Sequence, residues 1–559
     1  MTLGKYDFVI VGGGSAGAVM ASRLSEDPSI SVCLIEAGKD TAGAAEPAVV
    51  RSPTLIAGHQ PELLWPDYMA KFSEISMPMW YKQGRIMGGG SSVNATQAPR
   101  AMPTDFDQWT ELGIDGWRYD DVRPYYRKLE RDHDFDGDEH GKDGPIDVRR
   151  HRRADWPPFT TAITTQMIKD GDAYVDDMNG DYRDGVQRLT MTTNGERRMT
   201  TAYGYLTESV RARPNLTIIA ETTVERLLFN GDKVIGVKSG DSDVFGNMVV
   251  LSAGALGSPA IMMRSGIGPK DELDRGGVTQ LHALEGVGRN VQDHPVLFIA
   301  CHIIKAAMQN PKIKNHLNAG WRGSSNLPGA DPHDLYLNFP NSTTWNALGQ
   351  RTAAVAVSLY KPKSTGRITL DWDKPIAAPH AAFNFWSEAI DLERMRALTR
   401  KAWAILDQDA VKPMIKERFG LSFTPYVMKM NFRNRRNAFL AKLLVLLLDG
   451  PRFLRKLLFR WFIIQGRPMA EIIDDDAALD HWIKVNATSF YHPCCSCRMG
   501  PKDDPMAVVD SRGSVHGVAG LSVVDASIMP TIPSANLNLT VIMMAEKIAD
   551  EIKQARQNG

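Results

Sequence analysis

The stretch YDFVIVGGGSAGAVMASRL, residues 6–24, decides the fold of this chain. Its mostly apolar beginning predicts a buried strand, and its end predicts a helix. Between them lies GxGxxG, formed by Gly12, Gly14 and Gly17, with Ser15 in the same turn. Missing side chains at such a turn let backbone amides and the positive end of the helix approach a pyrophosphate. The stretch therefore indicates half of a doubly wound α/β sheet that binds a dinucleotide.

A second strand, VCLIEAG, follows the helix and carries Glu36, which comes nineteen residues after Gly17. A carboxylate at the end of this strand can accept hydrogen bonds from a ribose diol. Glycine-rich turns are common by themselves, and a mere tight turn is the alternative reading. The glycine turn here lies between a strand and a helix, and an acid ends the next strand. This combination favours a dinucleotide-binding site over a mere tight turn.

Composition sets the limits of the fold and of the partners. The chain has 559 residues, 43% of them hydrophobic, which is enough for a large core and two domains. Its 65 basic and 65 acidic residues give no general reason to expect a nucleic-acid partner. The strand at Tyr6 starts too close to Met1 for a secretory signal, so we expect a cytoplasmic protein.

Five cysteines are too few, and odd in number, for a disulfide framework, so reduced thiols are expected. Three of them cluster at Cys494, Cys495 and Cys497. Zinc sites generally need cysteines spaced by two to four residues and a second ligand pair, which the sequence lacks. We therefore expect no metal, and no role can be assigned to these thiols.

Five further segments specify the chemistry. They are GRIMGGGSSVN (84–94), SAGALGSPAIMMRSGIG (252–268), GVGRNVQDHP (286–295), YHPCCSCRMG (491–500) and DASIMPTIPSANLNLTVIMMAEKIAD (525–550). In this order, and over essentially the whole chain, they resemble the glucose-methanol-choline family of flavoenzymes. The resemblance implies an α/β fold with a Rossmann-like FAD-binding domain and a substrate domain, in which an antiparallel sheet is covered by helices. It also implies FAD-dependent oxidation of an alcohol.

The resemblance implies positions for the cofactor as well. Asn94 would form a hydrogen bond near the reactive face of the flavin. The alternative is that Asn94 only stabilises a turn. Members with covalently attached FAD carry histidine where this chain has Val93, so non-covalent FAD is expected. The other implied FAD contacts are Gly89, Ser91, Val224, Asp525, Ala526 and Asn538.

The chemistry is expected at His492 and Asn536. Oxidation of an alcohol removes a hydroxyl proton, and a histidine with a pKa near 6.5 can accept it at pH 7. An asparagine amide can hold the oxygen as its charge develops, and the resemblance selects Asn536 over Asn538 for this role. On its own, a histidine before Pro493 would more often be structural. Tyr491 and Phe490 are expected to line the substrate pocket.

Chain order predicts the domains. The FAD domain is expected from residues 1–155, 195–298 and 485–559, and the substrate domain from 156–194 and 299–484. The second domain is rich in aromatic residues, which agrees with an apolar or aromatic (benzylic, furanic or lignin-derived) primary alcohol. These are Trp321, Tyr336, Phe339, Trp345, Phe383, Phe385 and Trp386.

One segment, 429–467, departs from the family pattern. It holds ten Lys or Arg residues against one acid, Asp449, around the run LLVLLL. We expect two short amphipathic helices broken at Gly450 and Pro451, too short to span a bilayer. A basic amphipathic segment of this kind often lies on a membrane surface, and a lid or a subunit interface is the alternative.

Several alternatives remain open at this point. The electron acceptor can be dioxygen or a membrane quinone, and the basic segment tilts the choice slightly toward a quinone. An aliphatic or choline-type alcohol could be oxidised by the same residues, His492 and Asn536. A light-driven fatty acid decarboxylase shares the fold, but the branch known to us lacks the histidine at position 492. A lyase or a flavin-binding protein without turnover would leave His492 and Asn536 as bystanders. The oligomeric state cannot be read from the sequence.

Overall fold

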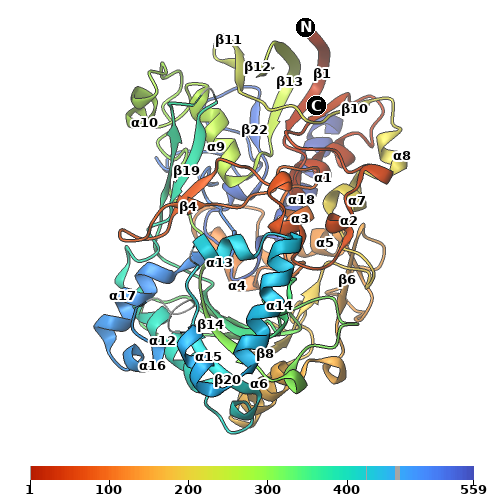
Figure 1. The fold of residues 1–559 in the computed structure, drawn as a ribbon. Coiled ribbons are helices and arrows are strands. Elements are labelled where there is room, and N and C mark those ends of the chain that lie inside the picture. The colour runs from red at the N-terminus through yellow and green to blue at the C-terminus, as the bar shows by residue number, and fades with distance from the viewer. Residues whose placement is uncertain (1, 375, 424, 460–465, 559) are drawn as a thin grey trace.

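The computed structural model describes residues 2–374, 376–423, 425–459 and 466–558 (Figure 1). Its first sheet has β1 near the centre, with Val9 and Ile10 fully buried. Strands β1, β2, β10, β13 and β22 are parallel, as expected for strands buried on both faces. The sheet has seven strands, in the order β10 (Leu216–Ile219), β2 (Val32–Ile35), β1 (Thr2–Val11), β13 (Ser242–Leu251), β12 (Lys233–Ser239) and β11 (Arg226–Asn230), with β22 (Leu521–Val523) paired to β13.

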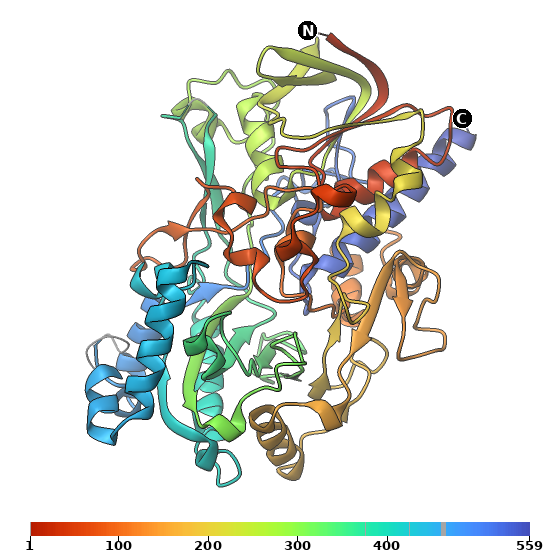
Figure 2. The ribbon, with the colours of Figure 1, turned by 45° about the vertical axis from the view of Figure 1, so that its right-hand side comes forward.

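The glycine turn connects β1 to α1 (Ser15–Leu24). Gly12 has φ +99°, a conformation that favours glycine. A Cβ on Gly17 would lie 1.8 Å from the carbonyl oxygen of Gly12, so only glycine lets the helix start this close to the strand. Helix α18 (Leu537–Asn558) packs against α1, and Figure 2 shows the two side by side. The doubly wound half that the sequence predicts is therefore present.

The second sheet is mostly antiparallel and lies in the other half of the molecule (Figure 1). Helix α12 (Ala389–Ile405) packs against β14, β16 and β17. The order is β20 (Ile415–Gly420), β14 (Pro295–Ile303), β17 (Thr352–Leu359), β16 (Leu335–Asn338), β15 (Ala319–Gly323), β8 (Gly185–Arg188) and β7 (Tyr174–Val175), with β21 (Thr488–Ser489) paired to β14.

The two sheets can be compared with the expected domain boundaries. The first sheet takes its strands from all three segments assigned to the FAD domain. Strand β14 crosses the expected boundary at residue 298, and β21 joins the second sheet from the last segment. The chain thus passes between the halves within one strand, and the division into domains stays a prediction.

The basic segment forms helices on the outer surface of the second half in both views (Figures 1 and 2). Helix α13 (Pro425–Met430) leads into the segment, and α14 (Arg435–Asp449) and α15 (Arg452–Leu458) lie within it. The break between α14 and α15 falls at Gly450 and Pro451, as expected. Residues 460–465, with Arg460 and Trp461 of the basic segment, lie outside the described residues. No helix in the described ranges has both the length and the apolar character to cross a bilayer.

Two smaller sheets and further helices complete the described chain. The sheets are β18 (Arg367–Asp371), β19 (Ala378–Ala382), β3 (Met69–Lys71) and β4 (Met79–Trp80), and β5 (Glu130–Asp132), β6 (Ile146–Arg150) and β9 (Thr190–Met191). The helices are α2 (Ala48–Arg51), α3 (Gly90–Val93), α4 (Pro103–Glu111), α5 (Tyr119–Leu129), α6 (Pro158–Lys169), α7 (Thr201–Tyr205), α8 (Glu208–Arg211), α9 (Gly254–Arg264), α10 (Lys270–Arg275), α11 (Ala347–Gln350), α16 (Met469–Ile472) and α17 (Asp476–Asn486).

Candidate active site

A cavity of about 960 Å³ is lined by residues of both halves of the molecule. Most of the residues expected to bind cofactor or substrate line it: Gly12, Gly14, Ser15, Glu36, Gly89, Asn94, Val224, Phe490, Tyr491, His492, Asp525, Ala526, Asn536 and Asn538. Gly17 and Ser91 are not on the wall. Gly17 packs against Gly12, and the Ser91 hydroxyl donates to the carbonyl of Gly88 at 2.6 Å. These two residues support the wall from behind.

One end of the cavity fits a dinucleotide. Gly14 precedes helix α1 and supplies no side-chain cap, so the first amides of the helix remain available to a phosphate. Asn538 accepts from the Ser15 hydroxyl at 3.0 Å, and its buried Nδ2 has no partner among the described residues. A buried amide of this kind at a cavity wall fits a bound ligand that accepts its hydrogen bond.

Two carboxylates flank this end. Glu36 accepts from the backbone amides of Gly13 and Gly38, both at 2.7 Å, and burial raises its pKa to about 7. Asp525 accepts from the Gly254 amide at 2.8 Å and the Ser258 hydroxyl at 2.5 Å. Both side chains therefore tie neighbouring loops together where they line the cavity.

The protonation of His492 can be assigned from its neighbours. Its Nδ1 lies 2.9 Å from Nδ1 of His294, so one of the two nitrogens must donate. The other nitrogen of His294, Nε2, faces two carbonyl oxygens, of Tyr360 and Pro533, each at 3.1 Å, and must carry a proton. Burial, and the neighbouring His492, hold the pKa of His294 well below its usual value, so its Nδ1 is bare. His492 therefore donates from Nδ1, which leaves its Nε2 as an acceptor.

The unprotonated Nε2 accepts a hydrogen bond from Asn536 Nδ2 at 3.3 Å. The Asn536 oxygen accepts from the Tyr360 hydroxyl at 2.9 Å, which turns the amide nitrogen toward the base. Burial lowers the pKa of His492 to about 3, so the imidazole is neutral at pH 7. A bare nitrogen and an amide donor thus face the same part of the cavity.

Local backbone structure places His492. Strand β21 pairs with β14, where Pro295 is opposite Ser489, and the chain then turns through Tyr491 at φ +63°. The buried Asp293 carboxylate accepts from the backbone amide of His492 at 2.9 Å and from the Tyr81 hydroxyl at 2.5 Å. Burial raises the pKa of Asp293 to about 6. Two strands far apart in the sequence thereby hold the histidine.

Sequence reasoning did not single out His294, Tyr360 or Gln97, whose Oε1 lies 3.4 Å from Asn536 Nδ2. The only available signal was the segment GVGRNVQDHP, which contains His294 and repeats the His-Pro pair of His492 and Pro493.

The aromatic set expected to agree with an aromatic substrate does not line the cavity. Six of these seven residues are buried in the core and Trp345 is partly buried. Other aromatic side chains form the wall instead: Trp65, Tyr68, Phe298, Phe419, Phe423, Phe459, Phe490 and Tyr491.

The cysteines near His492 are buried thiols. Cys494 and Cys495 have their sulfurs 3.3 Å apart, and all five cysteines of the chain are free. Burial raises the pKa values of Cys494 and Cys497, which keeps these thiols protonated. Buried, protonated thiols are chemically inert.

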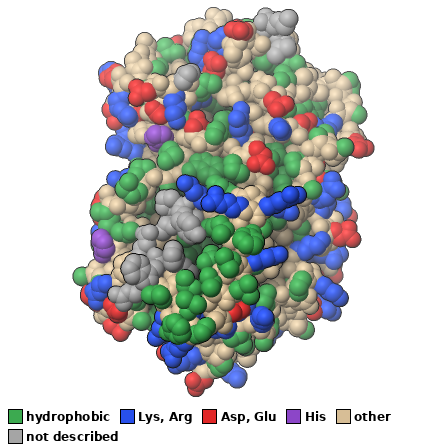
Figure 3. Space-filling model, in the orientation of Figure 1, with side chains coloured by type: hydrophobic (Ala, Val, Ile, Leu, Met, Phe, Trp, Pro, Cys, Tyr) green, Lys and Arg blue, Asp and Glu red, His purple; other side chains and the backbone are tan. Residues whose placement is uncertain are grey.

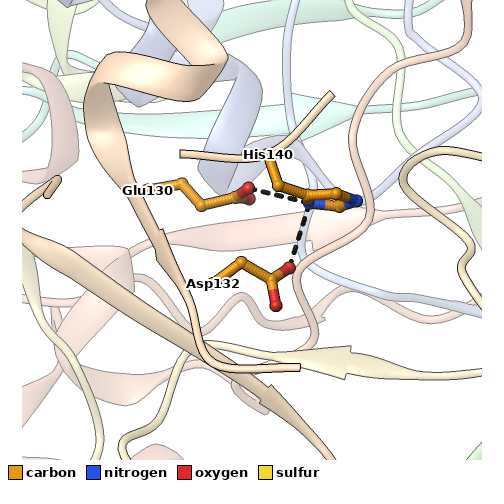
Figure 4. Close-up of side chains that lie close together, drawn as sticks. All are labelled: Glu130, Asp132 and His140. Carbon is orange, nitrogen blue, oxygen red and sulfur yellow. Dashed lines mark hydrogen bonds and ion pairs between the residues drawn. The ribbon is translucent and has the colours of Figure 1, made fainter. Parts of the chain in front are cut away.

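A polar cluster that the sequence did not predict lies away from the cavity. His140 contacts Glu130 at 3.1 Å and Asp132 at 3.0 Å through Nδ1 (Figure 4), and Asp177 at 2.8 Å through Nε2. Glu130, Asp132 and His140 have the types and spacing that could hold a metal ion. However, Arg100 pairs with Glu130 at 2.6 Å and Arg150 with Asp132 at 2.8 Å. With a protonated His140, the three carboxylates face three cations without a metal.

Comparison with known proteins identifies the family. The GMC oxidoreductase family matches residues 6–296 with its N-terminal part and residues 362–545 with its C-terminal part. The chain is 36% identical to 5-(hydroxymethyl)furfural oxidase of Methylovorus sp. (strain MP688), with 99% of each chain covered. It is 33% identical to oxygen-dependent choline dehydrogenase of Ectopseudomonas mendocina (strain ymp), over 98% of this chain and 94% of that protein.

Among solved structures, pyridoxine 4-oxidase from Mesorbium loti superposes with a TM-score of 0.80 at 26% identity, over 98% of this chain and 99% of that one. The chain therefore belongs to the GMC oxidoreductase family. It is an FAD-dependent oxidoreductase that acts on CH–OH groups, and the family and fold implied by the sequence are confirmed.

Proposed function

We propose that this enzyme oxidises a primary alcohol with an apolar or aromatic substituent to the aldehyde, with His492 as the base. The observation that carries the proposal is the chain of hydrogen bonds from the two carbonyls through His294, which leaves the Nε2 of His492 bare. A neutral imidazole with its lone pair toward the cavity suits a general base for a hydroxyl proton.

Each residue then has a task. The alcohol oxygen would lie between His492 Nε2 and Asn536 Nδ2, which are close enough for one oxygen to contact both. His492 takes the hydroxyl proton at Nε2, and Asn536 donates to the oxygen as negative charge develops on it. Bound FAD supplies a hydride acceptor for the substrate carbon. Tyr360 keeps the Asn536 amide in the donating orientation.

The wall of the cavity supports an apolar or aromatic substituent, because eight aromatic side chains line it. The name of the furfural oxidase relative points to a furanic alcohol. We expect benzylic and furanic alcohols to give larger kcat/KM values than choline or short aliphatic alcohols. A panel of these alcohols with flavin bleaching as readout measures this order, and choline as the best substrate would reject the proposed class.

His492→Ala tests the base. Without a proton acceptor, the rate of anaerobic flavin reduction should fall about a hundredfold or more, while FAD stays bound. His481→Ala is the matched control, since His481 is exposed on α17. An unchanged rate in His492→Ala would remove His492 from the mechanism and favour a flavoprotein with other chemistry.

We further propose that FAD is held without a covalent bond, by the glycine turn, Glu36, Gly89, Asn94, Val224, Asp525, Ala526 and Asn538. Val93, which lines the cavity, has no nucleophilic atom. Acid precipitation should release the flavin into the supernatant, and a yellow pellet would contradict this.

With one alcohol substrate, peroxide yield compared with dye reduction decides between dioxygen and a quinone as acceptor.

A further inference from the structure

Helices α14 and α15 present two different faces. Toward the protein, Ala441 and Leu448 are buried, and Leu448 packs with Ala300, Ala354, Phe419 and Phe459 against the second sheet. Toward solvent, Phe439, Leu446 and Phe453 are 67%, 71% and 74% exposed, with Leu443 and Leu457 also exposed. We call Phe439, Leu443, Leu446, Phe453 and Leu457 the outer face. Exposed apolar side chains gathered in this way mark an interaction surface.

The exposed charged side chains of residues 433–456 are all basic. Arg433, Arg435, Arg436, Lys442, Arg452 and Lys456 are exposed, and none of them lies within ion-pair distance of a carboxylate in the described ranges. Figure 3 shows hydrophobic side chains over α14 and α15 with basic side chains beside them. The one acid of the segment, Asp449, is occupied by Arg351 at 2.6 Å and Lys416 at 2.7 Å.

The position of two of these cations is unfavourable for the helix itself. Arg435 and Arg436 are the first two residues of α14, and its first turn has no acidic residue. Positive charge at a helix N-terminus opposes the helix dipole, so helix stability does not explain these residues. An anionic partner that contacts this end of α14 does explain them.

We propose that the outer face of α14 and α15 docks onto an anionic phospholipid bilayer. Basic side chains meet the headgroups, and the phenylalanines and leucines enter the interface, as in helices that lie in the membrane plane. With fifteen residues, α14 is about 22 Å long, shorter than the roughly 30 Å of a bilayer core, and it is held flat on the protein by Asp449.

Docking also has a consequence for the cavity. Leu444, Leu447 and Leu458, on the same two helices, line the cavity that contains His492. A docked bilayer would lie about one helix diameter, roughly 10 Å, from the cavity wall. This arrangement suits apolar ligands that are dissolved in the bilayer.

Vesicle sedimentation with the FAD-loaded full chain tests the proposal. The protein should pellet with vesicles of phosphatidylcholine containing about 30% phosphatidylglycerol, and much less with pure phosphatidylcholine or at about 0.5 M salt. A protein that stays in the supernatant under every condition would overturn docking. Because this readout needs no turnover, it is independent of the proposed alcohol oxidation.

Two sets of variants locate the contact. In Arg435→Gln/Arg436→Gln/Lys442→Gln each lost cation should reduce partitioning about fivefold, or about a hundredfold in total. Removing positive charge from the N-terminus of α14 does not destabilise the helix, because these cations oppose its dipole. A loss of vesicle binding in this variant is therefore not explained by unfolding of α14. Phe439→Ser/Phe453→Ser should lose binding as well. The controls are Lys502→Gln/Arg512→Gln and Met77→Ser/Leu281→Ser, which change exposed residues elsewhere.

All variants should oxidise a water-soluble alcohol at the wild-type rate without vesicles, since none of the changed residues lies at His492. Light scattering after size exclusion tests the alternative that a second copy of the chain covers the outer face. If the wild type is a dimer that becomes monomeric in Phe439→Ser/Phe453→Ser, and no form binds vesicles, the outer face is an interface between two copies and the proposal fails.

Discussion

At the scale of single residues, the site depends on which nitrogen carries a proton. His294 has its Nε2 committed to two carbonyl oxygens, and because its lowered pKa keeps it neutral, His492 must donate from Nδ1. Tyr360 takes part twice, because its carbonyl accepts from His294 and its hydroxyl donates to Asn536. One tyrosine therefore sets the tautomer of the base and the orientation of the amide.

Tyr360→Phe tests the second of these roles. The variant keeps the ring, which stacks on His294 at 4.5 Å, and removes only the hydroxyl that orients Asn536. Losing one orienting hydrogen bond of about 1 kcal/mol should slow flavin reduction about fivefold, with FAD content unchanged. Tyr336→Phe is the control, since Tyr336 stacks on Tyr360 at 4.1 Å without bonding to Asn536. Equal effects of both variants would indicate a packing role.

At the scale of elements, the junction of β1 and α1 depends on close contact between backbones. The Gly17 position cannot hold a side chain because the carbonyl oxygen of Gly12 occupies that space. The helix N-terminus is consequently held against the end of the strand, where its amides face the cavity.

Gly17→Ala should displace α1 and release the cofactor. Its Cβ would lie 1.8 Å from the Gly12 oxygen, so the turn must open and the amides must move. We expect protein purified without flavin absorbance, or an FAD dissociation constant raised at least a hundredfold. Ala18→Gly is the control, because it weakens the same helix by about 1 kcal/mol but adds no atom. Normal FAD content in Gly17→Ala would show that the turn does not position the cofactor.

The sequence was informative where structure is local. The strand, turn and helix at residues 6–24 and the break at Gly450 follow from neighbouring residues, and both are present. His294 and Tyr360 were missed because strand pairing brings together residues that are far apart in the sequence. His294 is 198 residues from His492, and Tyr360 is 66 residues from His294. Composition alone could not decide whether the aromatic residues of 299–484 form core or cavity wall, and the structure places most of them in the core.

At the scale of the whole molecule, buried charges connect segments that the sheets leave apart. The cluster around His140 joins the sheet of β5 and β6 to the loop that carries Asp177, which follows β7 of the second sheet. Burial by itself lowers the pKa of His140, but hydrogen bonds to Asp132, Asp177 and Glu130 outweigh it and raise this pKa to about 10. The charged imidazole thereby serves as a structural cation.

His140→Gln should lower the free energy of unfolding by about 3 kcal/mol near pH 6, as expected for breaking a buried charge cluster. Because the folded-state pKa of His140 is about 10 and the unfolded value is near 6.5, the charge stabilises fully below pH 6.5 and loses its effect as pH rises to 10. The difference between wild type and variant in chemical denaturation should therefore shrink across this window. His133→Gln, which removes a 29% exposed histidine paired with Asp147, should matter less. A difference that grows with pH, or wild-type stability that falls on adding a chelator, would instead favour a neutral His140 on a metal ion.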